Sequence, residues 1–249
     1  MDKSGNLYGT AGAAYELTHN PGVWKDTTLH NFTGKNGDGE DAISPVVLDA
    51  AGNVFGTTYL GGLQCGSSTC GTVYELSPQA GGKWKETVLI RFNGKNGQFP
   101  TGALLMDPSG TLYGATSLGG SHGGVVFKLT PSGDGRWTYS IIEDFPGGSE
   151  GYLPESGVVM DRNGNLYGTT GGGGNPSGCG VIYKLAPAGE GKWKYTVLHR
   201  FGEAPDGCAP AGDLTIDGSG NLYGGTLLGG SRGVGTVYEL TPDPTPSPQ

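Results

Sequence analysis

Three carboxylates in this 249-residue sequence stand where its repeating pattern does not require them. Glu155 and Asp213 lie in two copies of one segment type, at positions that are uncharged in the other copies, and Asp41 comes just before a third copy. Carboxylate oxygens gathered from three copies suit a hard cation such as calcium, and paired carboxylates can also transfer protons. The sequence therefore predicts a Ca²⁺ site formed by Asp213, Glu155 and Asp41. A solvated acidic rim is the alternative for a chain of net charge −8.

One of the four histidines is a candidate base for the same site. His122 follows Ser121 in a glycine-rich segment, whereas His30 and His199 share one repeat position that is expected to be solvated surface. The segment around Ser121 fits Gly-x-Ser-x-Gly, but so do two other segments, and the strand–turn–helix setting of a nucleophile elbow is absent. A Ser–His–Asp triad is therefore not expected, and His122 and Glu155 are assigned to proton transfer.

Aromatic residues outside the repeating pattern are few in the segments around these carboxylates. They are Tyr59, Phe99 and Tyr152, and each belongs to a different copy. A lectin with one equivalent site per copy would have a sugar-stacking aromatic ring in every copy. The sequence therefore favours one central site, with these three rings as substrate contacts.

Four short segments recur along the chain and must position these residues. The string Gly-Asn-Leu-Tyr-Gly-Thr at residues 5–10 returns in related form at 52–57, 110–115, 164–169 and 220–225. A segment of the Val-Tyr-Glu-Leu type follows it, then a segment that opens with Trp, and a Val-Val-Met-Asp type segment comes before it. All are short, rich in Val, Ile, Leu, Thr and Tyr, and bounded by Gly, Pro, Asp or Asn, as β-strands are.

Four strands in a unit of about 50–55 residues are typical of a β-propeller blade. We therefore expect an all-β protein: one five-bladed β-propeller of four-stranded antiparallel blades over residues 1–242, with incomplete first and last blades. Whether such a ring closes by itself, or further chain precedes it, is left open. The tryptophans are expected to pack between blades. Residues 243–249 are expected to be a proline-rich tail or linker.

The strand directions place the candidate site. We name the strands of a unit a (Val-Val-Met-Asp type), b (Gly-Asn-Leu-Tyr type), c (Val-Tyr-Glu-Leu type) and d (Trp type). Because successive strands alternate in direction, the b–c loops and the d–a loops meet on one face, around the mouth of the axial channel. The Asp-x-x-Gly turns of the a–b hairpins lie on the opposite face and are expected to be turn chemistry, not calcium loops.

Composition excludes several classes of protein. The 51 glycines and 16 prolines would suggest disorder without a repeat, but the 9% aromatic and 15% charged fractions indicate a packed core. The net charge of −8 and the absence of a basic block argue against a nucleic-acid partner. No apolar run approaches the roughly 18–20 residues of a membrane span, so no transmembrane segment is expected.

The four cysteines favour an oxidising compartment. Cys65 and Cys70 lie in one b–c loop, while Cys179 and Cys208 lie in a b–c loop and a d–a loop of one repeat unit. An even number placed in this way predicts two disulfides, Cys65–Cys70 and Cys179–Cys208. A metal site of four cysteines is the weaker alternative, because no Cys-x-x-Cys pair is present.

The pattern Asp-x-x-Gly-Asn-Leu-Tyr-Gly-Thr, then Gly-Gly, then Gly-Thr-Val-Tyr-Glu-Leu-Thr-Pro resembles the GloVer tandem repeat of bacterial extracellular proteins, over essentially the whole chain. The resemblance implies a secreted or cell-surface bacterial protein, whose export signal is not present in this chain, and often a surface anchor. It supplies no activity and no catalytic residues. The first copy departs from the pattern, because its b–c connection has lost most of its loop.

Two functions remain open. The first is an extracellular, metal-dependent hydrolase with one calcium-type site at the channel mouth, which acts on a small ester, lactone or glycoside; that link is an analogy with other propellers. The second is a non-catalytic secreted or surface module that binds carbohydrate or a protein partner through the same loops. The chain is expected to be a monomer in either case.

Overall fold

The computed structural model describes residues 1–202 and 205–241. The predicted tail at 243–249 lies outside the described residues. Apart from one short 3₁₀ turn, η1 (Gly148–Glu150), the regular structure is β-strand, which confirms the all-β prediction. No helix within the described part is long and apolar enough to cross a membrane.

The main strands form five antiparallel sheets, which we number sheets 1 to 5 in chain order. Sheet 1 consists of β1 (Leu7–Thr10), β2 (Ala13–Asn20) and β3 (Val23–Asn31). Sheet 2 has the order β5 (Val47–Leu48), β6 (Val54–Thr58), β10 (Thr72–Gln79) and β11 (Lys83–Arg91).

The three later sheets repeat this order. Sheet 3 contains β12 (Gln98–Met106), β13 (Leu112–Leu118), β14 (Val125–Pro131) and β15 (Trp137–Asp144). Sheet 4 contains β16 (Val159–Met160), β17 (Leu166–Thr170), β18 (Val181–Pro187) and β19 (Trp193–Arg200). Sheet 5 contains β20 (Gly207–Ile216), β21 (Leu222–Gly229) and β22 (Val237–Leu240). The order a-b-c-d is therefore as predicted; in the described residues sheet 1 has no strand a and sheet 5 no strand d.

Two small two-stranded sheets were not predicted. β4 (Gly39–Glu40) pairs with β7 (Leu60–Gly61), and β8 (Gln64–Cys65) pairs with β9 (Ser68–Thr69). The first pair joins the loop after sheet 1 to the loop that follows β6 of sheet 2. The second lies within the b–c loop of sheet 2, beside the Cys65–Cys70 bridge.

The a–b hairpins are closed by an aspartate, as predicted. Asp161 Oδ1 accepts hydrogen bonds from the backbone N–H groups of Asn163 and Asn165, both at 2.9 Å, and Asp161 Oδ2 accepts one from Tyr167 Oη at 3.0 Å. Gly164 supplies the positive φ of 78° that the turn requires. These bonds lower the pKa of the Asp161 carboxyl against the opposing effect of its burial. The carboxylate oxygens are thus used in the turn itself.

Aromatic and aliphatic side chains fill the space between neighbouring sheets. Between sheets 3 and 4, Phe145 lies 5.3 Å from the ring of Tyr183, and Val126 and Leu185 are fully buried in the same cluster. Trp84, Trp137 and Trp193 pack against three such clusters, as predicted. Trp24 is different: it is 49% exposed, because no sheet precedes sheet 1 in the structure.

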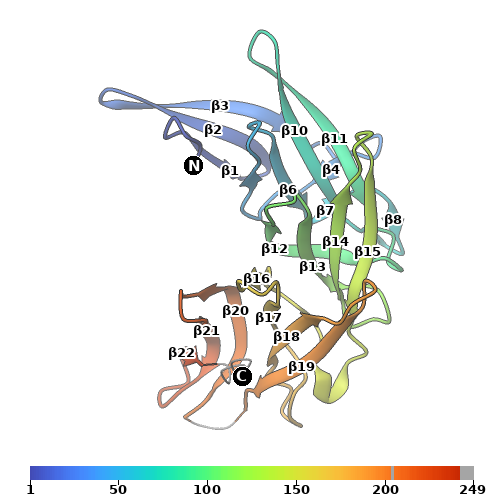
Figure 1. Ribbon diagram of the computed structural model, residues 1–249, viewed down its shortest axis with the longest axis vertical. Coiled ribbons are helices and arrows are strands. Elements are labelled where there is room, and N and C mark those ends of the chain that lie inside the picture. Colours follow the sequence, from blue (N-terminus) through green and yellow to red (C-terminus); the bar gives the residue numbers. More distant parts are fainter. Residues whose placement is uncertain (203–204, 242–249) are drawn as a thin grey trace.

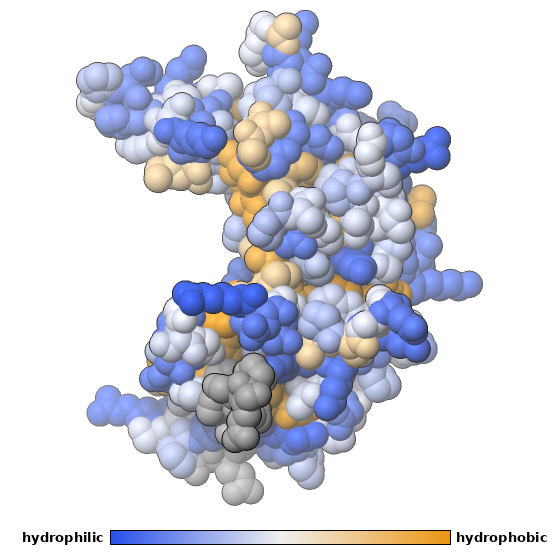
Figure 2. Space-filling view, in the orientation of Figure 1, coloured by the Kyte–Doolittle hydropathy of each residue, from blue (hydrophilic) through white to orange (hydrophobic). Residues whose placement is uncertain are grey.

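The five sheets follow an arc, with sheet 1 and sheet 5 at its two ends (Figure 1). The space-filling view is hollowed between those ends (Figure 2). The outer faces of the terminal sheets are accordingly exposed to solvent. Val237 of sheet 5 is 90% exposed, whereas Val126, at the same repeat position in sheet 3, is fully buried.

Both predicted disulfides are present, and none of the four cysteines is free. Cys65–Cys70 closes a short loop with a sequence separation of 5. Cys179–Cys208 has a separation of 29 and joins the b–c loop of sheet 4 to β20 of sheet 5. The second bridge therefore ties the last sheet to its neighbour covalently.

Candidate functional site

The d–a loop of one sheet is hydrogen-bonded to the b–c loop of the next, so these loops share one face as predicted. The backbone N–H of Gly120 donates to the carbonyl oxygen of Gly94 at 2.8 Å, across the gap from sheet 2 to sheet 3. Tyr152 and Gly172 exchange two backbone bonds of 3.0 Å at the next junction. The candidate site is therefore carried by pairs of loops that fix each other.

A repeated glycine sets the path of each d–a loop. A Cβ on Gly97 would come within 2.8 Å of the Thr116 side chain, so the loop can pass only with a residue that has none. Phe99, two residues after Gly97, has a positive φ of 57°. Asp41, two residues after the equivalent Gly39 in the loop before sheet 2, has a positive φ of 60°. Two predicted site residues thus occupy the same turn position in different loops.

The three predicted calcium ligands do not form one cluster. Asp213, on β20, accepts a hydrogen bond from the backbone N–H of Gly157 to its Oδ1 at 2.6 Å. Glu155 is exposed in the loop before β16, close to Gly171, and Asp41 is exposed in the loop before β5. Within residues 1–202 and 205–241, the group of three such side chains with ligand atoms within 4.8 Å of one another lies elsewhere, at His30, Asp38 and Glu86. Calcium at the channel mouth stays a prediction.

His122 lies on the predicted face and is exposed, with a φ of 102°. Its ring Nδ1 contacts the carbonyl oxygen of Ser121. Asp144 accepts bonds from the Ser121 N–H at 2.7 Å and from its hydroxyl at 2.8 Å. The hydroxyl of Ser121 is therefore paired directly with the aspartate and not with the imidazole, so these three residues are not arranged as a catalytic triad.

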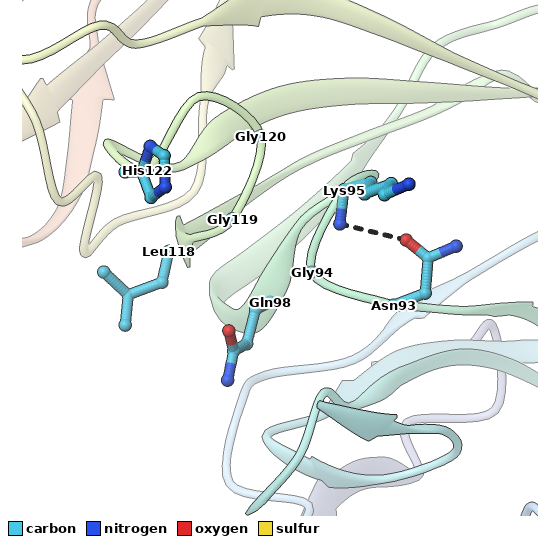
Figure 3. Close-up of a pocket in the computed structure, with 8 residues that line it drawn as sticks. All are labelled: Asn93, Gly94, Lys95, Gln98, Leu118, Gly119, Gly120 and His122. Carbon is cyan, nitrogen blue, oxygen red and sulfur yellow. Dashed lines mark hydrogen bonds between the residues drawn. The ribbon is translucent and has the colours of Figure 1, made fainter. Parts of the chain in front are cut away.

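His122 is one wall of an open pocket of about 380 Å³ between the d–a loop of sheet 2 and the b–c loop of sheet 3 (Figure 3). The first loop supplies Asn93 and Lys95, and β12 begins with the lining residue Gln98. Leu118 and two glycines complete the wall beside His122. None of the eight lining residues is acidic.

The side chain of Asn93 is held by a turn in the first loop. Asn93 Oδ1 accepts the backbone N–H groups of Lys95 and Asn96, both at 3.0 Å, and Asn96 Oδ1 accepts the N–H of Asn93 at 2.8 Å. Lys95 itself is exposed and, among the described residues, has no carboxylate within ion-pair distance. The pocket thus offers amide, imidazole and ammonium donors.

Burial raises the pKa of one carboxyl group on β15, a strand of sheet 3. The pKa of Glu143, on β15, is raised to about 7 by desolvation, with further contributions from the negative charges of Asp144 and Glu150. Such a group could exchange protons near neutral pH. It is not among the residues that line the pocket.

The predicted aromatic contacts are engaged within the protein. Tyr59 and Phe99, from different repeats, stack on each other with ring centroids 4.7 Å apart and an interplanar angle of 14°. The ring of Tyr152 lies against Gly172, where a Cβ would come within 2.5 Å of it. All three rings are half-buried, so each has only part of its surface for a ligand.

Sequence reasoning missed Asn93, Lys95 and Gln98. A signal was available, because Gly-Lys-Asn-Gly occurs at 34–37 and again at 94–97 and nowhere else in the chain. The second copy is followed directly by Gln98, Phe99 and Pro100, whereas the first copy is followed by Asp38, Gly39 and Glu40. The sequence does not show that the following b–c loop completes a pocket against that copy.

The strand order and the arrangement of sheets place this chain among all-β proteins that are built like β-propellers. The chain belongs to the Gloeobacter/Verrucomicrobia repeat family, whose model matches residues 1–160 and 121–247. The resemblance seen in the repeats is thereby confirmed. No curated protein matches the chain in sequence.

Solved structures show the same fold at low identity. Luciferin-regenerating enzyme is 17% identical with a TM-score of 0.57, over 96% of this chain and 73% of that one. PorZ, a bacterial surface component of the type-IX secretion system of Porphyromonas gingivalis, is 14% identical with a TM-score of 0.56, over 96% of this chain. A variant of the NanB sialidase from Streptococcus pneumoniae is 14% identical with a TM-score of 0.50, over 91% of this chain. The chain spans only 31% of PorZ and 34% of NanB.

Proposed function

We propose that this protein is an extracellular binding module that takes a carbohydrate with acidic groups in the pocket between the loops of sheets 2 and 3. The observation that carries the proposal is the lining itself: Asn93, Lys95, Gln98 and His122 offer donors, and no lining residue is acidic. Sugar hydroxyls pair with amide and imidazole groups, and a carboxylate or sulfate pairs with an ammonium.

The same observation weighs against hydrolysis in this pocket. Metal-assisted or acid–base hydrolysis of esters and glycosides uses carboxylates beside the scissile bond, as metal ligands or as proton donors. The pocket supplies none, and Asp213, Glu155 and Asp41 are not gathered into one cluster in the described residues. Binding without turnover requires only the amide, ammonium and imidazole donors that line the pocket.

The experiment compares two oligosaccharides that differ in the group at C6 of each sugar, a charged carboxylate or a neutral hydroxymethyl group. Calorimetric titration with oligogalacturonate should give binding, whereas neutral oligogalactose of the same length should bind at least about tenfold more weakly, since one charge-assisted bond is worth about 1.5–3 kcal/mol. Lys95→Gln should abolish that preference, and Gln98→Ala should weaken both ligands. Equal affinity for both sugars in wild type would refute the charge argument.

Lys35 provides the matched control. It is exposed and holds the same place in the first Gly-Lys-Asn-Gly copy, but it does not line the pocket. Lys35→Gln changes the net charge by the same amount as Lys95→Gln. A loss of binding in both variants would indicate attraction by overall charge, and would remove the pocket from the proposal.

A hydrolase with calcium at the channel mouth is the second candidate. What favours it is the fold, because two of the similar structures carry the names of enzymes, luciferin-regenerating enzyme and a sialidase. Under this candidate Asp213, Glu155 and Asp41 hold the ion, and His122 with Glu155 moves the proton. Turnover of an ester, lactone or glycoside panel that is lost on chelation and restored by Ca²⁺ would establish it. No turnover on the whole panel with Ca²⁺ present would exclude it.

The location and the architecture complete the proposal. Two disulfides and the repeat family support secretion or display at the cell surface. We take each sheet as one propeller blade, which gives five blades in an arc that is open between sheet 1 and sheet 5. Small-angle scattering of the purified chain tests this, because a closed ring and an open arc differ in their distance distributions.

A further inference from the structure

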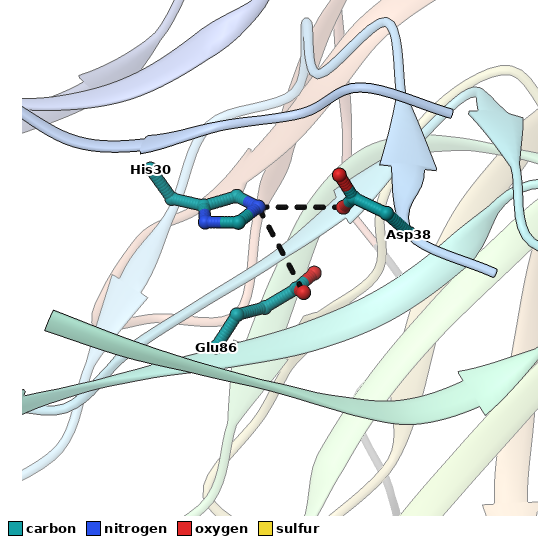
Figure 4. Close-up of side chains that lie close together, drawn as sticks. All are labelled: His30, Asp38 and Glu86. Carbon is teal, nitrogen blue, oxygen red and sulfur yellow. Dashed lines mark hydrogen bonds and ion pairs between the residues drawn. The ribbon is translucent and has the colours of Figure 1, made fainter. Parts of the chain in front are cut away.

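A second cluster of chemically competent side chains lies away from the pocket, between sheets 1 and 2 (Figure 4). His30, at the end of β3, points its Nε2 at Asp38 Oδ1, 3.3 Å away, and at Glu86 Oε2, 3.8 Å away. Asp38 lies in the loop after sheet 1, and Glu86 is on β11 of sheet 2. The three side chains are 25%, 13% and 16% exposed, so they are shielded but reachable from solvent.

In sheets 3 and 4 a tyrosine stands at the repeat position of Glu86. The residues equivalent to Glu86 are Tyr139 on β15 and Tyr195 on β19. Each tyrosine donates its hydroxyl to a backbone carbonyl of the preceding d–a loop, at Asn96 and at Glu150. Sheet 2 therefore replaces a neutral donor with a carboxylate, at a point where the facing residue of the preceding loop is the acidic Asp38.

This substitution places two carboxylates side by side and leaves one of their oxygens without a partner among the described residues. Glu86 Oε1 is buried and, in the described part of the chain, has no hydrogen-bond partner. The positive charge of Arg91 acts on Glu86 from a distance, but its Nε–H donates to the carbonyl oxygen of Gly37 at 2.7 Å, and among the described residues it forms no ion pair with either carboxylate. Asp38 is held by Thr33, whose N–H and hydroxyl both lie 2.7 Å from Oδ2. One imidazole nitrogen thus faces two carboxylates.

We propose that His30, Asp38 and Glu86 bind a divalent transition-metal ion of the Zn²⁺ type, which links sheet 1 to sheet 2. One imidazole nitrogen and two carboxylates form a ligand set of the kind that Zn²⁺ accepts, and the ligand atoms already lie within 4.8 Å of one another. The ion would neutralise both carboxylates, and bidentate binding by Glu86 would also give its Oε1 a partner. Water from the exposed side completes its coordination.

The site has a structural consequence. Sheet 1 has a neighbouring sheet on one side only, and its cluster with sheet 2 is built on Ala14, Leu29 and Tyr74. An ion held by ligands from both sheets adds its binding free energy to that contact, since binding to the folded state alone stabilises it. Zn²⁺ should therefore raise the stability of the chain, and of sheet 1 in particular.

The test uses Zn²⁺ itself with the full chain. In wild type, calorimetry should show one Zn²⁺ per chain, and an excess of about 100 times Kd should raise Tm by roughly 5–10 °C. Glu86→Tyr restores the residue that sheets 3 and 4 carry at this position, so it should fold. It should weaken Zn²⁺ by more than about 100-fold, because the loss of an outer partner alone costs about 10–100-fold.

A natural control is present in sheet 4. His199 Nε2 lies 3.0 Å from Asp206 Oδ2, at the repeat positions of His30 and Asp38, but no strand d follows it in the described part of sheet 5 to supply a third ligand. His199→Gln should leave Zn²⁺ affinity unchanged, whereas His30→Gln should reduce it as Glu86→Tyr does. An equal Tm shift in wild type and in Glu86→Tyr, or no saturable binding, would overturn the proposal.

Discussion

Asp213 reaches across from sheet 5 and accepts the backbone N–H of Gly157, in sheet 4's loop before β16, at 2.6 Å. The carboxylate lies so close to this backbone that a Cβ on Gly157 would be 3.0 Å from the same oxygen. A residue that sequence comparison between the repeats singles out as a metal ligand thus makes a bond between sheets. Of the two carboxylate oxygens of Asp213, Oδ1 therefore already accepts a hydrogen bond.

The first prediction follows from that bond. Asp213→Ala removes a charged acceptor and leaves the Gly157 N–H without its partner, so it should destabilise the chain by about 1.5–3 kcal/mol in urea unfolding. Asp213→Asn keeps an acceptor oxygen and should cost less than half as much. If Ca²⁺ stabilises wild type and fails to stabilise Asp213→Asn, the carboxylate is a metal ligand as well.

The second prediction concerns Glu143 and pH. Its pKa is raised from 4.5 to about 7 in the folded chain, first by burial and then by Asp144 and Glu150. The folded state therefore holds this proton more tightly than the unfolded state does. The contribution to stability is complete below about pH 4.5 and is lost as the pH rises to about 7.

Glu143→Gln keeps the neutral form at every pH. It should stabilise the chain at pH 8 by about 1 kcal/mol, a figure reduced from the full shift because the side chain is partly exposed. The gain should vanish at pH 4.5. Urea unfolding from pH 4.5 to 8 measures it, with Glu190→Gln, whose side chain is 89% exposed, as the control. A gain that is the same at every pH would contradict the assignment.

The third prediction tests the open arc with one substitution at two equivalent places. Val126→Ala removes two buried carbons between sheets 3 and 4 and should cost about 2 kcal/mol. Val237→Ala at the same position in sheet 5 should change stability by less than about 0.5 kcal/mol, because that side chain is 90% exposed. Equal costs would mean that the face of sheet 5 is covered in solution.

Much of the fold could be predicted because each strand type recurs in similar form. Segments such as Leu166–Thr170, which is buried along its whole length, are short, aromatic and β-branched like a strand, and Asp161 with Gly164 forms the turn before it. The stacking of Tyr59 on Phe99 fits their expected position on one face, from different repeats. A segment whose secondary structure is ambiguous by itself can be assigned when similar segments recur at the same place in every repeat.

The site could not be predicted to the same extent, since it depends on loop paths that the repeat does not encode. The pocket arises because the loop with Lys95 meets the loop with His122, and backbone bonds between glycines decide that meeting. His30 was predicted to be solvated surface, and this was wrong. Its side chain is only 25% exposed, because Glu86 of the next sheet lies over it, a contact between residues 56 positions apart.

The fourth prediction separates the two disulfides. In the chain-entropy description a bridge over 29 residues restricts the unfolded state by about 3–4 kcal/mol, and one over 5 residues by about 2 kcal/mol. Replacing Cys179 and Cys208 by serine should therefore lower stability more than replacing Cys65 and Cys70. Urea unfolding of the two variants measures the difference.

The larger loss should be local, because Cys208 anchors sheet 5, which has one neighbouring sheet. Hydrogen exchange should show β20–β22 losing protection first in the Cys179/Cys208 variant, while β12–β15 stay protected. The Cys65/Cys70 variant should keep sheet 5 as protected as in wild type, and equal deprotection in both variants would show that the bridge is not what holds the last sheet.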